Sequence, residues 1–276
     1  MEKRSSHGII FILLIFLAIL FIIPILIVLI NSFKGQFYIN DMPFALPNAM
    51  TFTGLDNFVR GIEKTGFLKA FGYSTFITLF SVGLIVVFTS MTAWYITRVR
   101  SKHTEFMYYL FVFSMIIPFQ IVMFTMTKIA NLLHLDNPLG ILILYLGFGA
   151  GLSVFMFCGF VKSIPLEIEE AATIDGCTPI RTFFSVVMPI LKPTTITVAI
   201  LNTMWIWNDY LLPYLVIGSD YKTIPIAIQY LKGGYGSIDM GAMMALLVLA
   251  IVPIIVFYLV CQKYIIEGVV AGAVKG

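Results

Sequence analysis

The chain has 276 residues, of which 60% are hydrophobic and only 11% charged, and its formal net charge is +3. Its mean hydropathy is +0.99. Soluble domains carry about 25% charged residues, so this composition argues against a soluble enzyme, a disordered chain and a disulfide-stapled secreted scaffold. We therefore expect an integral membrane protein, without the basic patch of a nucleic-acid-binding protein.

Six continuous apolar segments are each long enough to cross about 30 Å of hydrocarbon as a helix. The strands of a membrane barrel would instead appear as alternating segments of about 10 residues. Lys3 and Arg4 precede the first segment as in a signal peptide, but the apolar stretch is too long and no small-x-small cleavage site follows, so we expect a retained span. We predict one all-α membrane domain over residues 1–276, with spans at about residues 8–30, 73–96, 106–128, 139–161, 194–217 and 241–262.

Lysine and arginine in short loops indicate which side of the membrane faces the cytoplasm. Ten of the 17 such residues fall on the side of the N-terminus and seven on the other, four of these in the long segment 32–70, where the rule is weak. The short loop with Arg98, Arg100 and Lys102 is the clearest indicator. We predict that both termini are cytoplasmic, that residues 32–70 form a partly structured external segment, and that residues 163–193 form a cytoplasmic one.

The cytoplasmic segment 163–193 has the signals of a helix, a glycine turn and a second helix. Pro165 suits the first turn of a helix, Gly176 can adopt the left-handed conformation that ends one, and Pro179 can start the next. The second helix would carry one apolar face, formed by Ile180, Phe183, Phe184 and Val187. Such an element suits docking to another protein; a loop packed on its own spans or lying at the lipid head groups is the alternative.

The same segment resembles the EAA loop of binding-protein-dependent ABC importer permeases, whose pattern is E-A-A-x3-G-x9-I-x-L-P. Val186 and Met188 replace the usual Ile and Leu. Five residues match at full spacing: Glu170, Ala171, Ala172, Gly176 and Pro189.

The likeness covers nearly the whole chain and is weakest over residues 32–70. It extends to the sugar-importer branch of these permeases, and in particular to its maltose-transporter-type second permease subunit. The segments that carry it are Pro118-Phe119-Gln120, Trp207-Asn208-Asp209 and the tail from Gln262 to Gly276.

This resemblance implies a type I ABC importer permease fold in the bacterial cytoplasmic membrane. It implies as partners a second related permease, an ATPase dimer that binds ATP and Mg²⁺, and an extracytoplasmic solute-binding protein; this chain itself would bind no cofactor. Segment 163–193 would sit in a cleft of the ATPase, with Glu170 bonded to an arginine there. Gly176 would permit the turn, and Ile180, Phe183 and Phe184 would form an apolar anchor.

No catalytic or metal-binding constellation is present in the sequence. The motifs G-x-x-x-x-G-K-[ST] and H-E-x-x-H do not occur, and the three histidines are far apart. Cys158, Cys177 and Cys261 are too few and too scattered for a disulfide framework or a zinc site. We therefore expect a transport subunit rather than an enzyme, driven by ATP hydrolysis on a partner.

The fifth span is the best candidate for the substrate path. Thr195, Asn202 and Asp209 are spaced by seven residues, and Trp205 lies between them on the same helix face. A carboxylate near the membrane marks an interior or water-facing site, and an aromatic ring beside polar groups suits a sugar; an interfacial aromatic belt is the alternative. Two further candidates are Asn208 and Gln120, the latter near Pro118, which frees a backbone carbonyl.

The external loop from Gln229 to Asp239 is rich in glycine and aromatic residues. The resemblance implies that this loop reaches into the binding protein and helps to empty it, and a plain connector is the alternative. The candidate residues are Gln229, Tyr230, Gly233, Gly234, Tyr235 and Gly236.

The sequence therefore predicts the permease subunit of an ATP-driven sugar importer, in particular one for oligosaccharides. A permease for a non-sugar solute is the first alternative. An ion-coupled secondary transporter is the second, and it is disfavoured because the middle of each predicted span holds no Asp, Glu, Lys or Arg.

Overall fold

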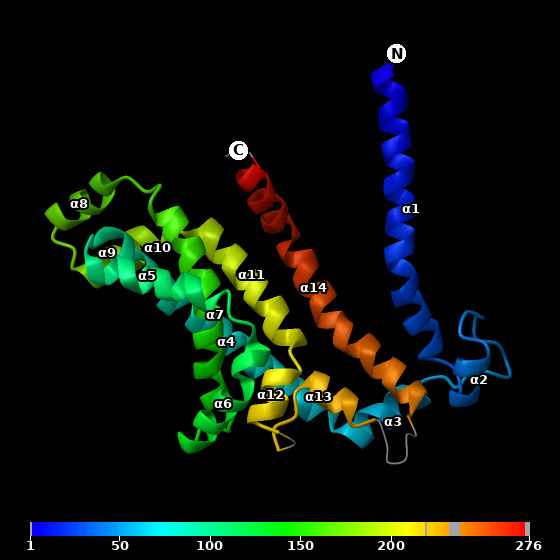
Figure 1. Cartoon of the computed structure of the whole chain (residues 1–276). Coiled ribbons are helices and arrows are strands. Elements are labelled where there is room, and N and C mark those ends of the chain that lie inside the picture. Colours follow the sequence, from blue (N-terminus) through cyan, green and yellow to red (C-terminus); the bar gives the residue numbers. More distant parts are fainter. Residues whose placement is uncertain (1, 219, 232–237, 274–276) are drawn as a thin grey trace. The chain divides into compact units, whose positions relative to one another are not determined.

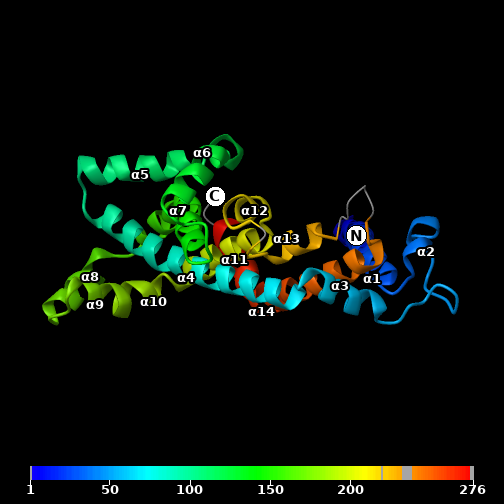
Figure 2. The same ribbon diagram turned by 90° about the horizontal axis from the view of Figure 1, so that it is seen from below.

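The computed structural model describes residues 2–218, 220–231 and 238–273 (Figures 1 and 2). These residues are almost entirely helical and contain no β-strand, only one isolated antiparallel bridge between Lys34 and Phe52. The chain divides into two compact units: unit 1 comprises Met1–Lys69 and Ile226–Ile255, and unit 2 comprises Ala70–Pro225 and Val256–Gly276. The predicted all-α architecture is confirmed.

Among the described helices, four are long and apolar enough to cross a membrane. The number rises to six if each of two bent helix pairs counts as one span. The four are α1 (Glu2–Asn31), α4 (Phe67–Arg98), α7 (Gly140–Val161) and α14 (Met240–Ala273). The first pair joins α5 (Lys102–Ser114) to α6 (Phe119–Leu132), and the second joins residues 179–190 to α11 (Lys192–Asn208).

The third predicted span, 106–128, is not the continuous helix expected from its hydropathy. α5 and α6 meet at an angle of 108°, and Pro118 before α6 is extended, with φ −61° and ψ 135°. Proline has no N–H to donate and disfavours the helical conformation of the residue before it. Pro118 therefore breaks the span.

The fifth predicted span, 194–217, is interrupted as well. α11 ends at Asn208, Asp209 is extended, and α12 (Leu211–Val216) follows. The Asp209 carboxylate accepts the backbone N–H groups of Leu211, at 3.0 Å, and Leu212, at 3.5 Å. An aspartate that bonds to the backbone in this way competes with a continuous helix, so the break has a local cause.

Unit 1 is held together around α3 (Asp56–Thr65), which follows the short helix α2 (Gln36–Asp41). The buried amide of Asn57 donates to the carbonyls of Ser32, at 2.9 Å, and Lys34, at 2.8 Å, and thereby ties α3 to the chain after α1. The predicted external segment 32–70 thus has helical structure of its own, as expected.

In unit 2, neighbouring helices approach α7 closely at two of its glycines. A Cβ added at Gly149 would meet Ile85 of α4 at 2.6 Å and Asn202 of α11 at 2.9 Å. A Cβ added at Gly151 would meet the backbone carbonyl oxygen of Phe111, on α5, at 2.8 Å. Small residues permit such close approach between membrane helices. Figures 1 and 2 show α8 and α9 at one end of this unit and α12 toward the other.

The contact at Gly151 predicts that Gly151→Ala destabilises the protein, because a backbone carbonyl cannot rotate away as a side chain can. Overpacking of this kind costs about 1–3 kcal/mol. Gly147→Ala on the same helix is the matched control, since a Cβ there meets nothing within 4 Å. We expect a lower thermal unfolding midpoint in detergent for Gly151→Ala only; equal midpoints for the two variants would contradict this packing.

Candidate functional site

The segment predicted to dock to another protein has the expected helix–glycine–helix geometry. α8 (Leu166–Ile174) starts directly after Pro165, which lies one position before the predicted first turn. Gly176 is left-handed, with φ 80°, and α9 (Pro179–Thr182) starts at the proline predicted to open it. The turn prediction for Gly176 is therefore confirmed.

Glu169 anchors this segment to α4, a role that the sequence analysis missed. Its carboxylate accepts from the Arg98 guanidinium at 2.7 Å and from the indole Nε1 of Trp94 at 2.8 Å. Arg98 also donates to the carbonyl of Ile164, at 2.9 Å. Glu169 is buried, whereas Glu170 beside it is exposed and forms no salt bridge with a described residue. The exposed carboxylate of Glu170 is thus free to meet another molecule.

The predicted apolar face of the second helix is not one surface. α9 passes into a π-helical turn, η1 (Phe183–Val187), and then α10 (Met188–Ile190). Phe183 is fully buried, with its ring 5.5 Å from that of Trp94, while Ile180 is 67% and Phe184 47% exposed. The prediction that Phe183 belongs to an external apolar anchor is therefore wrong. Ile180 and Phe184 remain exposed and can contact a partner.

Pro189 accounts for the π-helical turn. It has no N–H to donate to the carbonyl four residues earlier, so the α-helical pattern fails just before it. The N–H of Met188 bonds instead to the carbonyl of Phe183, five residues back. Phe183 and Val187, at the two ends of this turn, are both fully buried, so one side of the predicted face packs inward.

A cavity of about 480 Å³ lies between α8 and α9. Ala172 is buried near it and Ala171 is exposed. The lining of this cavity combines the acidic edge of α8 with the start of α9. The lining residues are Trp94, Leu166, Glu169, Glu170, Thr173, Ile174, Cys177, Pro179 and Thr182. The hollow can receive a side chain from a partner.

The polar residues of the fifth predicted span do not share one open face. Asn202 is buried and donates to the Ser153 hydroxyl, on α7, at 3.2 Å and to the carbonyl of Val198 at 2.9 Å. The Thr195 hydroxyl is buried without a hydrogen-bond partner among the described residues. Asp209 lies beyond the end of α11. The helix-face argument therefore fails for Asn202, which contacts α7, and for Asp209, which is not helical.

Tyr145 of α7 nevertheless brings Trp205 and Asp209 together. Its hydroxyl donates to the Asp209 carboxylate at 3.0 Å, and its ring meets the Trp205 ring edge-on, with centroids 5.5 Å apart. Tyr145 is fully buried and Trp205 is 41% exposed. Sequence reasoning missed Tyr145, whose one signal was a hydroxyl within an apolar span.

The two remaining path candidates stand apart from this group. Asn208 is exposed and donates to the carbonyl of Met204 at 2.7 Å. Gln120 is exposed in the first turn of α6. The structure thus brings together Trp205 and Asp209 from the predicted set and adds Tyr145.

The loop from Gln229 to Asp239, predicted to be external, is anchored on its C-terminal side by Asp239. This carboxylate accepts from Arg60 at 2.9 Å and from Lys64 at 2.7 Å, both on α3, and caps α14 through the N–H of Ala242. Burial raises the pKa of Asp239, but the bonds from Lys64, Ala242 and Arg60 outweigh it and hold the pKa below its ordinary value. On the other side, Gln229 and Tyr230 are exposed at the end of α13 (Ile224–Gln229).

Four of the predicted loop residues lie outside the described residues: Gly233, Gly234, Tyr235 and Gly236. Within the described part of the chain, no group of three or more His, Cys, Asp or Glu side chains could hold a metal ion.

The chain matches a known family over the region that contains the anchored segment and the fifth span. The model of the family "Binding-protein-dependent transport system inner membrane component" matches residues 98–270. The chain belongs to this family. Its members are the membrane permeases of ABC importers, non-catalytic subunits whose ATP hydrolysis is carried out by a partner, so the expectation of a transport subunit rather than an enzyme is confirmed.

Two relatives extend the match over nearly the whole permease. This chain is 39% identical over 262 residues to the probable starch degradation products transport system permease protein AmyC of Thermoanaerobacterium thermosulfurigenes. The alignment covers 95% of this chain and 94% of the relative. The chain is 36% identical over 279 residues to the multiple sugar-binding transport system permease protein MsmG of Streptococcus mutans, covering 99% of each.

Solved structures confirm the ABC importer permease fold. The permease resembles a chain of a bacterial ABC transporter involved in the import of the acidic polysaccharide alginate, with a TM-score of 0.76 at 20% identity, covering 95% of this chain and 97% of that one. A bacterial alginate transporter in complex with a pentasaccharide-bound periplasmic protein gives a TM-score of 0.60 at 15% identity, covering 96% and 94%.

The anchor of α8 predicts that Glu169→Gln destabilises the permease. The variant leaves the Arg98 guanidinium in a largely buried place without its counter-charge, which costs about 3 kcal/mol. We expect a lower thermal unfolding midpoint and faster protease cleavage within residues 163–178. Glu170→Gln is the matched control, because its exposed carboxylate has no such partner; equal loss in both variants would show that the pair is not the anchor.

The ion pairs of Asp239 predict a pH dependence of stability. Because the folded pKa lies below the unfolded one, the carboxylate stabilises unit 1 above the unfolded pKa, and this contribution is lost as the pH falls below about 4. Asp239→Asn should lower the unfolding midpoint at neutral pH and flatten its fall in acid. Asp41→Asn, an exposed carboxylate of the same unit, should leave both unchanged; a wild-type acid profile in Asp239→Asn would refute the prediction.

Proposed function

We propose that this permease is one membrane subunit of an ATP-driven importer of sugars, and of oligosaccharides in particular. The observation that carries the proposal is its similarity to permeases named for sugar transport: the starch-product and multiple-sugar proteins, and an arabinooligosaccharide permease that is 31% identical over the full length of both chains.

The group of Tyr145, Asp209 and Trp205 is the proposed contact of this subunit with the sugar. The partly exposed indole of Trp205 offers a ring face on which the C–H groups of a pyranose can stack. The adjacent carboxylate, already held by the Tyr145 hydroxyl, accepts further hydrogen bonds from sugar hydroxyls. Asp209 also caps α12, so its position is fixed before the substrate arrives.

Coupling to the ATPase is proposed for the exposed side of segment 163–193. Glu170, Ala171, Ile180 and Phe184 are exposed there, beside the 480 Å³ hollow between α8 and α9. Glu170 would form a charge-assisted bond to an arginine of the ATPase, and the two apolar side chains would seat against its surface.

The proposed assembly contains a second homologous permease, a cytoplasmic ATPase dimer that binds ATP and Mg²⁺, and an extracytoplasmic solute-binding protein. The loop from Gln229 to Asp239 is proposed to face the binding protein. The complex would lie in the bacterial cytoplasmic membrane with both termini of this chain in the cytoplasm, and this chain would bind no cofactor.

The proposal is tested by reconstituting the permease with its partner permease, ATPase and binding protein in vesicles. Sugar-stimulated ATP hydrolysis and sugar uptake are measured across a panel of malto-, galacto- and arabino-oligosaccharides. We expect both activities to require ATP and at least one member of the panel. Stimulation by a non-sugar solute alone, or uptake without the ATPase, would overturn the proposal.

The coupling role predicts that Glu170→Lys and Gly176→Asp abolish sugar-stimulated ATP hydrolysis while the permease stays in the membrane. The first reverses the charge offered to the ATPase, and the second forces a side chain into a left-handed turn. Glu167→Lys is the matched control, because it makes the same charge change at another exposed position of α8. Normal coupled uptake in both test variants would remove the assignment.

A further inference from the structure

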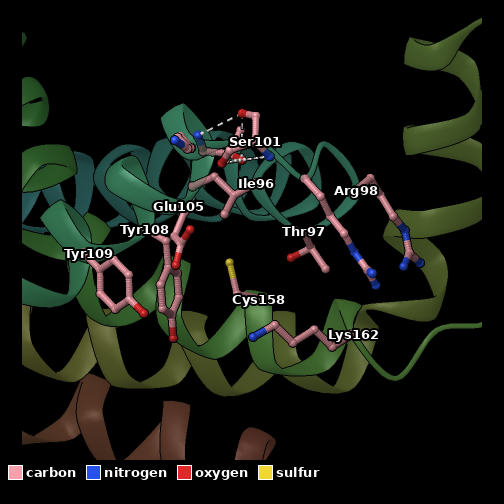
Figure 3. Close-up of a pocket in the computed structure, with 12 residues that line it drawn as sticks. Ile96, Thr97, Arg98, Ser101, Glu105, Tyr108, Tyr109, Cys158 and Lys162 are labelled. Carbon is pink, nitrogen blue, oxygen red and sulfur yellow. Dashed lines mark hydrogen bonds between the residues drawn. The ribbon is translucent and has the colours of Figure 1, made fainter.

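A second pocket lies on the predicted cytoplasmic side of unit 2, away from the sugar-contact group. Its volume is about 810 Å³, and it is enclosed by the end of α4, the start of α5 and the end of α7. Figure 3 shows Arg98 and Lys162 extending into the same space as Tyr108 and Cys158. The lining residues are Ile96, Thr97, Arg98, Arg100, Ser101, Lys102, Thr104, Glu105, Tyr108, Tyr109, Cys158 and Lys162.

The pocket carries a net positive charge, and most of its cations have no salt-bridge partner among the described residues. Arg98 is neutralised by Glu169, but Arg100, Lys102 and Lys162 form no salt bridge with any residue that the structure describes. Lys162 instead lies over the ring of Tyr108, 5.5 Å from its centroid, a contact that holds its ammonium group within the pocket. Glu105 is the acidic residue of the lining. The three cations without a salt bridge therefore leave a net charge of +2 in the pocket.

One flank of the pocket is apolar and exposed. Around Tyr109, which lines the pocket, α5 carries three large apolar side chains that are more than half exposed: Phe106, Leu110 and Phe113. Two apolar helices also end here, since α4 stops at Arg98 and α7 at Val161. A cationic hollow at the level where spans end, beside an apolar helix face, matches a ligand with a charged head and a hydrocarbon tail.

We propose that this pocket binds the phosphate head group of an anionic phospholipid, with the acyl chains along α5. Arg100 offers paired N–H donors to a phosphate, and Lys102 and Lys162 add point charges; basic pockets at the cytoplasmic ends of membrane helices bind lipid head groups in this way. The proposal does not depend on the transported solute. It places a lipid next to Arg98, whose guanidinium holds segment 163–193 through Ile164 and Glu169.

The test measures lipid retention by the purified full-length permease with native mass spectrometry, after incubation with equal amounts of phosphatidylglycerol and phosphatidylcholine. We expect wild type to retain phosphatidylglycerol preferentially and Arg100→Gln/Lys162→Gln to retain at least about tenfold less. Arg181→Gln/Lys192→Gln, which removes the same charge at exposed positions outside the pocket, should behave as wild type. Equal retention in all three proteins would overturn the proposal.

Two further arms keep the test independent of the folding of the double variant. Glu105→Gln removes the acidic side chain of the lining and should raise phosphatidylglycerol retention; an unchanged value would count against the pocket. Millimolar inorganic phosphate should fail to displace the lipid from wild type. Displacement would assign the cations to a soluble phosphate instead, and would overturn the lipid assignment.

Discussion

The position of segment 163–193 depends on one largely buried ion pair. Glu169 and Arg98 are brought out of water against a penalty of several kcal/mol per ion, and this penalty is offset because both carboxylate oxygens are satisfied, one by the guanidinium and one by the Trp94 indole. The pair fixes α8 on the end of α4. It also decides which acidic side chain faces outward, since anchoring Glu169 leaves Glu170 on the exposed side of the helix.

The remainder of unit 2 is arranged around α7. Gly149 and Gly151 let three neighbouring helices approach its backbone, and Tyr145 carries a hydroxyl from the same helix to Asp209. In a membrane, where burying apolar surface drives little association between helices, close packing and buried hydrogen bonds hold the bundle. α7 supplies both the close packing and the buried hydrogen bond. Its sequence is apolar along its whole length, however, and gives little indication of which face each neighbouring helix packs against.

The sequence allowed the fold class, the family and the turn at Gly176 to be predicted, because each depends on local chemistry: long apolar runs, a spaced motif and a residue that tolerates positive φ. The breaks in the third and fifth spans could also have been predicted, since each has a local cause in the sequence, Pro118 in one and Asp209 in the other. The roles of Glu169 and Tyr145 could not be predicted in this way, because their partners lie 71 and 64 residues away in the chain. The burial of Phe183 was missed for the same reason, because its ring packs against Trp94 of α4, far away in the chain.

Trp94 contacts both halves of segment 163–193, through its indole N–H to Glu169 and through its ring to Phe183. A displacement of either α8 or η1 is therefore delivered to the same residue of α4, one turn before that helix ends. α4 has 32 residues, about 48 Å of continuous helix, which exceeds the thickness of the hydrocarbon core of a membrane. The Trp94 indole therefore links both halves of segment 163–193 to a helix that is long enough to span the membrane.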